Sequence, residues 1–208
     1  CCSKEKNLAR NEGLIFTIMN IGWLVGPIVA GYISEAYNLP IIFVLAGIFM
    51  IISLLMLMFM KITFKENKVK KTDNNYWKNL KTYFSNKNLV KNYIISGNSS
   101  IWWVFTFIYI PIYIIQSGLG IKWVSYFLFA IILPLVLFEY YFSKRANKIG
   151  FRKLFFWGNM FPLVALILCF FIDNIYLMLG VLVFGTIGMA MMEATTEAYF
   201  FLIAPKRR

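Results

Sequence analysis

The segment KITFKENKVKKTDNNYWKNLKTYFSNKNLVK, residues 61–91, decides how the rest of the chain is interpreted. It is a long polar run in a chain that is 60% hydrophobic and 19% aromatic, and it holds nine lysines against two acids, Glu66 and Asp73. Two long apolar segments precede it and four follow it. A run of about 20 apolar residues can cross a hydrocarbon core of ~30 Å. We therefore predict an all-α, polytopic membrane protein with six transmembrane helices.

The apolar segments give the expected boundaries of these helices. The six spans are predicted at about 14–34, 41–60, 93–115, 123–142, 154–172 and 175–199. In the second half of the basic segment 61–91, Trp77, Leu80 and Phe84 recur at near-helical spacing between lysines. This spacing is typical of an amphipathic helix in the headgroup region of a lipid bilayer, which we place at 76–92. A solvated linker is the equal alternative.

The distribution of positive charge predicts the orientation. Six spans place both ends of the chain, the segment 61–91 and a compact basic turn at 143–153 on one side. That side receives every Lys and Arg except Lys122. Since Lys- and Arg-rich loops stay inside, we expect this side to be cytoplasmic in a multi-pass protein of the cell membrane. The net charge of +12 therefore reflects membrane topology, and we expect no nucleic-acid partner.

The composition argues against most enzymes. The sequence has no histidine, which excludes Ser-His-Asp and Cys-His catalysis and zinc sites that need histidine. Its three cysteines make no disulfide framework. No acid dyad for intramembrane catalysis and no repeated polar ring of a channel is visible in the sequence. We expect no catalysis, no metal and no cofactor, whereas a non-transporting membrane scaffold or receptor stays open as an alternative.

The first span carries a glycine and proline pattern, Gly22-x3-Gly26-Pro27-x3-Gly31. Small residues at such spacing let two membrane helices approach closely, and a proline is tolerated there. We interpret the pattern as a tight packing face with a bend, while a bend that takes part in gating is the alternative. The second span, 41–60, is apolar all round, so we expect it to face lipid.

The third span, 93–115, is the most polar of the early spans. Polar groups are costly in lipid unless they face protein or water. Five of its residues follow the spacing i, i+4, i+8, i+11 and i+15, which puts them on one stripe of an α-helix. These candidate path residues are Asn98, Trp102, Thr106, Tyr109 and Tyr113. The stripe could bind an organic solute by stacking and hydrogen bonds, or it could pack against the next helix.

Two acids in the sixth span, Glu193 and Glu197, are spaced i, i+4 and share a helix face near the expected cytoplasmic end. A carboxylate there could close an inward gate by pairing with Arg145, Lys148 or Arg152. An ion pair in the wet interface with the basic residues at 206–208 is the alternative.

A third acid, Glu139, lies about three residues inside the expected end of its span. A charged carboxylate is costly within a membrane, so Glu139 is the candidate proton carrier. A local ion pair with Lys144 is the simpler alternative.

Three patterns resemble the major facilitator superfamily of transporters. The run 22–31 is similar to the family's fifth-helix motif, G-x3-G-P-x2-G-G, with Ala30 replacing one glycine. The segment 143–153 resembles its cytoplasmic loop motif, G-x3-D-R-x-G-R-R/K. Ser143, Asn147, Lys148 and Gly150 stand there for the first Gly, the Asp, the Arg and the second Gly. The runs 193–201 and 135–139 are similar to patterns of prokaryotic members.

The resemblance covers nearly the whole chain and implies helices five to ten of a twelve-helix fold. Residues 1–60 would end the first half, 61–92 would form the cytoplasmic loop between the halves, and 93–208 would begin the second half. Helices seven and ten line the path in this family, which adds Gly185 and Thr186 to the path candidates.

The function implied by the resemblance is secondary active transport. A small organic solute would cross the membrane by alternating access. The coupling ion would be H+ or another ion, and the full-length protein would be a monomer. The segment 1–208 by itself is expected not to transport.

Overall fold

The computed structural model describes residues 7–37, 40–60 and 76–204. Every element in these ranges is a helix, which confirms the predicted all-α class. The helices are α1 (Leu8–Ala36), α2 (Pro40–Phe59), α3 (Tyr76–Ser85), α4 (Lys87–Val104), the π-helix η2 (Phe105–Tyr109), α5 (Ile110–Gln116), α6 (Ile121–Ile149), α7 (Phe151–Phe170) and α8 (Ile175–Ile203).

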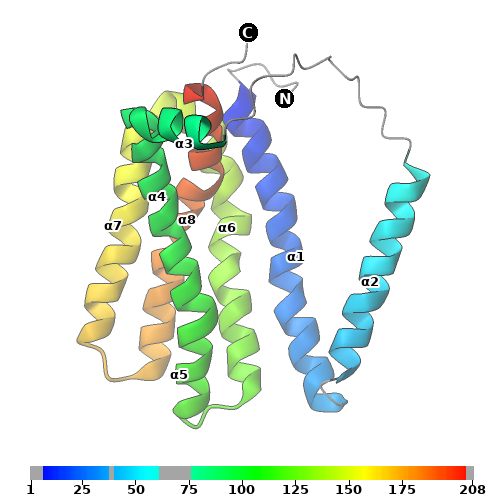
Figure 1. Cartoon of the computed structure of the whole chain (residues 1–208). Helices are drawn as coiled ribbons and strands as arrows, with labels where there is room; N and C mark the ends of the chain where they lie inside the picture. The colour runs from blue at the N-terminus through cyan, green and yellow to red at the C-terminus, as the bar shows by residue number, and fades with distance from the viewer. Residues whose placement is uncertain (1–6, 38–39, 61–75, 205–208) are drawn as a thin grey trace.

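Six helices in the described ranges are long and apolar enough to cross a membrane, as predicted. One of them, Lys87–Gln116, is composed of α4, η2 and α5 in succession. Figure 1 shows these six running up and down, with α3 lying across one end. The described connection α5–α6 and the α7–α8 turn lie at the opposite end from α3 and the α6–α7 junction.

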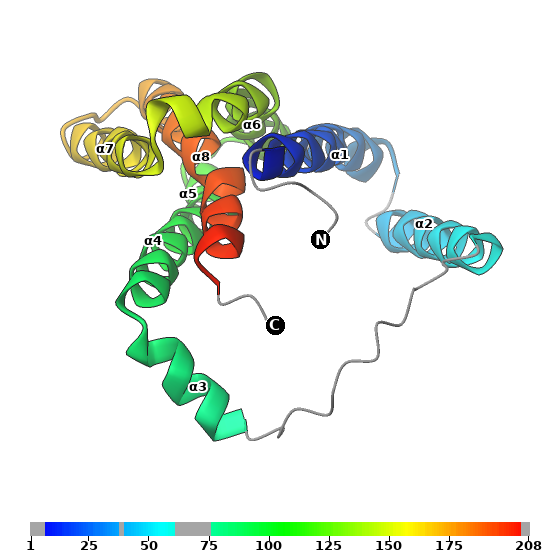
Figure 2. The same cartoon turned by 90° about the horizontal axis from the view of Figure 1, so that it is seen from above.

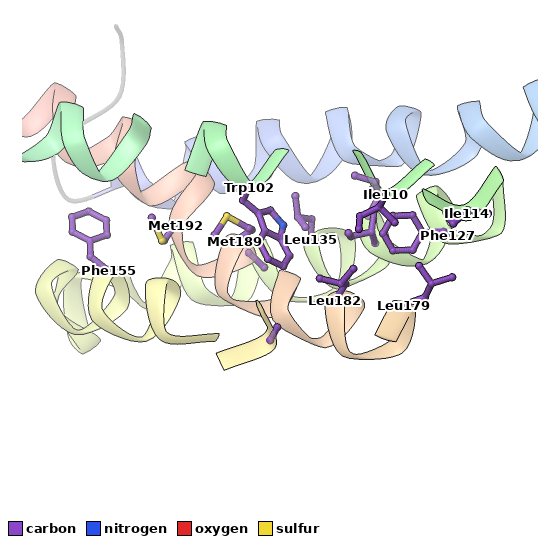
Figure 3. Packing of buried hydrophobic residues seen from close by; sticks show 14 residues of the cluster. Trp102, Ile110, Ile114, Phe127, Leu135, Phe155, Leu179, Leu182, Met189 and Met192 are labelled. Atoms are coloured by element: carbon purple, nitrogen blue, oxygen red, sulfur yellow. The ribbon is translucent and has the colours of Figure 1, made fainter. Parts of the chain in front are cut away.

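Helix α8 is the centre of the bundle. It contacts α7, α6, α1 and α4, and Figure 2 shows it between these helices. The buried core runs along its length, and Leu182, Met189 and Met192 belong to the same cluster as Trp102 of α4 and Leu135 of α6 (Figure 3). The helix that carries Glu193 is therefore the most enclosed part of the molecule.

Glycines set the closest approaches in this core. A Cβ at Gly188 would lie 2.7 Å from Cδ of Pro162, and one at Gly185 would lie 2.7 Å from Cβ of Ala165. Both contacts join α8 to α7. Real Cβ atoms essentially never come this close, so only glycine fits these positions without a shift of the neighbouring helix.

Helices α1 and α6 run antiparallel and are matched at two points. Gly13 lies against Ser143, and Gly31 lies against Ser125, each so closely that a Cβ on the glycine would collide with the serine. The two glycines are 18 residues apart, as are the two serines. Eighteen residues are five turns of an α-helix, so both contacts fall on one face of each helix.

Helix α2 differs from the others. It contacts α1, and none of its residues is buried within the described chain. Figures 1 and 2 show it standing apart from the bundle. A helix that is apolar on every side can face lipid all round, so this lack of burial within the described chain agrees with the lipid-facing position expected for α2.

Two predicted boundaries are wrong. The segment 143–153 is not a compact turn, because α6 continues to Ile149 and α7 begins at Phe151. Residues 143–149 contain no proline and favour a helix, which ends only at Gly150 with φ +89°. The predicted helix 76–92 is also split, because the Asn86 side chain accepts from the backbone N–H groups of Asn88 and Leu89 and caps α4.

Candidate functional site: buried carboxyl groups beside an aromatic cavity

The Glu139 side chain lies in the interior, 0% exposed, where α6 meets α1 and α8. Both of its carboxyl oxygens accept hydrogen bonds. The Asn20 Nδ2 donates to Oε2 at 2.7 Å, and the backbone N–H of Ala194 donates to Oε1 at 3.1 Å. The predicted local ion pair with Lys144 is wrong, because α6 extends ten residues beyond Glu139 and Lys144 lies over the Tyr140 ring instead.

The glycine contacts explain why Asn20 reaches Glu139. Asn20 follows Gly13 by two turns on α1, and Glu139 precedes Ser143 by about one turn on α6. The absent side chain at Gly13 lets the two backbones come close enough for a short amide to span them. A buried polar group that lacks a partner is costly, so this approach also satisfies the carboxyl group.

Glu193 lies next to Ala194 on α8 and is close enough to interact electrostatically with Glu139. Asn20 is a side-chain hydrogen-bond partner of Glu193 as well, but the two oxygens of Glu193 differ. The Oε2 atom of Glu193 is buried and has no hydrogen-bond partner in the described part of the chain. This oxygen is therefore an unused acceptor in the interior.

A cavity of about 270 Å³ opens beside these acids. It is lined by Asn20, Trp23, Trp103, Phe107, Ile132 and Glu193. These residues come from α1, α4, η2, α6 and α8. The cavity therefore lies where α1, which precedes the basic segment 61–91, meets helices that follow this segment. Among the described residues, those that line the cavity include no Lys or Arg.

The five path candidates of the third span do not lie on one face, because the regular α-helical stripe that was predicted is interrupted. Trp102 and Thr106 are buried, whereas Tyr109 and Tyr113 are 62% and 44% exposed. The buried positions beyond Thr106 are Ile110 and Ile114. The cause is η2, in which the Ile110 N–H donates to the carbonyl of Phe105, five residues back. A π-turn holds one residue more than an α-turn, so the buried face advances by one position.

The other path candidates are divided between the core and the outside of the bundle. Thr106 and Thr186 are fully buried and donate to carbonyls of their own helices, those of Trp102 and Leu182. Gly185 makes room for Trp102, since a Cβ there would lie 3.0 Å from its ring. Asn98 is exposed and donates to Asn159 of α7. The structure brings Trp102, Gly185 and Thr186 into the core and leaves Asn98 outside it.

The predicted gate partners are not together in this structure. Arg145, Lys148 and Arg152 are exposed, and Arg145 lies over the Tyr141 ring and donates to its hydroxyl. Glu197 is exposed beside a second cavity, whereas Glu193 faces the aromatic one. Among the described residues, Lys122 and Glu35 form a salt bridge of 2.6 Å. It joins the first turn of α6 to the last turn of α1.

The glycine pattern of the first span has one close contact. Gly31 meets Ser125, but a Cβ built at Gly22 or Gly26 would meet nothing within 4 Å among the described residues, so the predicted packing face is not formed at these two positions in the described chain. Helix α1 runs through Pro27 without ending. The glycine that matches Gly31 is Gly13, which lies outside the pattern and before the predicted span.

Five residues of the cavity are not among the predicted site residues: Asn20, Trp23, Trp103, Phe107 and Ile132. An amide within an apolar span is a usable signal for Asn20, because such groups are rare in lipid. The three aromatic residues carry no comparable signal, since rings are frequent throughout the chain.

Comparison with protein-family models gives a match to the Major Facilitator Superfamily over residues 2–208. The match spans both the helix that carries Asn20 and the helix that carries Glu193. Comparison with the curated proteins and with the solved structures found no match.

Proposed function

Because the chain belongs to the Major Facilitator Superfamily, we propose that the protein is a secondary active transporter that moves a small organic solute across the cytoplasmic membrane by alternating access. Membership of this family supports the assignment of the protein as a membrane transporter. The observation that carries the finer proposal is the cluster of Asn20, Glu139 and Glu193 beside a cavity between helices. Ionisable groups within a membrane are costly, and those that face a cavity typically mark a transport path.

In this proposal the cavity is the solute site, and two helix bundles rock about it. Residues 1–60 end the first bundle and residues 93–208 begin the second. The cavity lies where α1 meets α4, α6 and α8, so movement of the bundles changes the end from which a solute can enter.

Glu139 is the proposed proton carrier. A proton on its carboxyl group weakens the hydrogen bonds that it accepts from Asn20 and Ala194. Since these bonds join α6 to α1 and α8, protonation is coupled to the packing of three helices. The coupling ion in this scheme is H+, delivered to an atom that already holds the helices together.

The orientation and the role of α3 are also proposals. The distribution of Lys and Arg supports a cytoplasmic location for the end that carries α3 and the α6–α7 junction. Helix α3 exposes Tyr76 and Trp77, while Tyr83 lies against Phe200 of α8 and Phe84 against Tyr93 of α4. These rings suit a helix that lies in the interface between headgroups and acyl chains.

Access to the cavity tests the proposal without knowledge of the solute. The full-length protein, with its native cysteines replaced by serine, receives Phe107→Cys or, as a second cavity position, Trp103→Cys. A membrane-impermeant maleimide is then applied to right-side-out and to inside-out vesicles. Ile101→Cys on the outer face of α4 is the matched control, since Ile101 is exposed and lines a different cavity.

Alternating access predicts labelling of the cavity cysteines from both sides and of Ile101→Cys from neither. Ser117→Cys, between α5 and α6, is expected to react from outside, and Asn86→Cys from inside. Cavity cysteines that react from one side alone would contradict the transporter proposal and favour a scaffold or receptor.

A further inference from the structure

Three aromatic rings form one continuous wall of the cavity. Trp103 of α4 and Phe107 of η2 are one turn apart and stack, with ring centroids 5.3 Å apart and planes at 29°. Trp23 of α1 approaches the same Phe107 at 5.7 Å and 46°. The faces of aromatic rings carry a partial negative charge, so a wall of this kind attracts cations.

A carboxyl group lies on the same cavity. Glu193 contributes the buried Oε2 that has no partner in the described chain, whereas both oxygens of Glu139 are engaged. A buried carboxylate is costly unless an opposite charge or hydrogen-bond donors lie beside it. The described lining offers no basic side chain, so a cation that enters from outside would supply the missing partner.

From this juxtaposition we propose that the cavity binds a small organic cation, with a quaternary or alkylated ammonium group held between Glu193 and the rings of Trp23, Trp103 and Phe107. This inference rests on the proposed function, because it names the solute class of the same site. A volume of about 270 Å³ holds an alkylammonium head group with a short substituent. Cation–π contacts with several rings are a recurring way to recognise quaternary ammonium groups.

Two other solute classes fit this lining poorly. An anion would meet the Glu193 carboxylate and no basic partner among the described lining residues. A sugar needs several well-placed polar groups. Apart from the indole N–H groups of Trp23 and Trp103, the polar side chains of this described lining are Asn20 and Glu193. The Asn20 amide already donates to Glu139 and also interacts with the Glu193 carboxyl group, which leaves the unpartnered Oε2 of Glu193 as the main free polar contact.

The test compares a cation with a neutral molecule of the same shape. Purified full-length protein in detergent is titrated calorimetrically with tetramethylammonium, choline and benzyltrimethylammonium, and with 3,3-dimethylbutan-1-ol, the uncharged carbon analogue of choline. At least one of the three cations is expected to bind. Choline is expected to bind at least about tenfold more tightly than its analogue, because the analogue keeps the shape and loses the charge.

Variants assign the binding to this cavity. Glu193→Gln keeps the size of the side chain and removes its charge, so it is expected to weaken cation binding by about tenfold or more. Glu197→Gln is the matched control, one turn further along α8 and outside this cavity, and is expected to leave binding unchanged. Trp103→Ala is expected to abolish binding, whereas Trp103→Phe retains it. Melting temperatures show whether each variant is folded.

Several results would overturn the proposal. They are failure of all three cations to bind, equal binding to the folded Glu193→Gln variant, or equal affinity for 3,3-dimethylbutan-1-ol. The cysteine labelling described above needs no ligand, so the two proposals fail separately. Labelling from both sides without cation binding would contradict the proposed solute class and support the proposed transporter. Cation binding with labelling from one side alone would support the proposed cation site and contradict alternating access.

Discussion

Asn20 of α1 donates a hydrogen bond of 2.7 Å to Glu139 of α6, a residue that lies 119 positions later in the chain. Both side chains are buried. The bond joins α1, which precedes the basic segment 61–91, to α6, which follows it. It therefore satisfies a carboxyl group in the interior and ties two distant parts of the sequence together at once.

Asn20→Ala is expected to destabilise the protein by about 1–3 kcal/mol, because it leaves one oxygen of a buried carboxyl group without its donor. The midpoint of thermal unfolding in detergent measures this change. Asn98→Ala is the control, since Asn98 also donates to another helix but is exposed to its surroundings. Its expected effect is within about 0.5 kcal/mol. Equal losses in the two variants would argue against a special role for the Asn20–Glu139 bond.

Gly185→Ala is expected to cost about 1–3 kcal/mol, because a Cβ at this position lies 2.7 Å from Cβ of Ala165 and 3.0 Å from the Trp102 ring. Gly180→Ala is the matched control on the same helix, where a Cβ meets nothing within 4 Å. That control is expected to gain up to about 1 kcal/mol from the higher helix propensity of alanine. A folded Gly185→Ala protein as stable as Gly180→Ala would contradict the close packing of α8 on α7.

Gly13→Ala is expected to separate α1 from α6, since the new Cβ collides with Ser143. The compensating change Ser143→Gly removes the colliding atoms. The double variant is therefore expected to melt at a higher temperature than Gly13→Ala, even though glycine is the poorer helix former. Gly22→Ala lies on the same helix, and its Cβ would meet nothing within 4 Å among the described residues. It serves as the control and is expected to be neutral or stabilising. Additive effects of the two substitutions would rule out a direct contact.

Deletion of Ile108 is expected to be tolerated. This residue lies within η2 and is 52% exposed. Removing it turns the π-turn into an α-turn, and Ile110 and Ile114 then keep their place on the face of Trp102 and Thr106. Deletion of Ile112, which is 48% exposed but lies beyond the π-turn in α5, instead rotates Ile114 away by about 100°.

The readout for both deletions is the yield of monodisperse folded protein and its melting temperature. The Ile108 deletion is expected to stay close to the parent, and the Ile112 deletion to lose most of the folded protein. The opposite order would show that the wide turn is required for the fold.

The sequence predicts the spans well because membrane crossing depends on length and hydropathy, which are local properties. It predicts helix ends poorly. Residues 143–149 extend α6 through charged side chains, and Asn86 ends one helix and caps the next. Both features depend on helix propensity and capping in polar sequence, where hydropathy is uninformative.

The acidic residues of the site can be predicted from the sequence, but the groups that donate hydrogen bonds to them cannot. Glu139 and Glu193 stand out because carboxyl groups are rare in apolar spans. Their surroundings come from helices that no local pattern joins, such as the Asn20 amide and the Ala194 N–H. The π-turn adds a further error, because a regular 3.6-residue period selects Tyr109 and Tyr113 where the structure buries Ile110 and Ile114.

Helix α2 has no buried residue and lies against α1. Its 20 residues span about 30 Å, which matches the hydrocarbon thickness of an average bilayer. Within the described residues, the contact with α1 buries no residue of α2, so a thinner or thicker bilayer is expected to change the tilt of this helix first. We therefore expect the lipid composition of the membrane to change the angle of α2 more than the packing around α8.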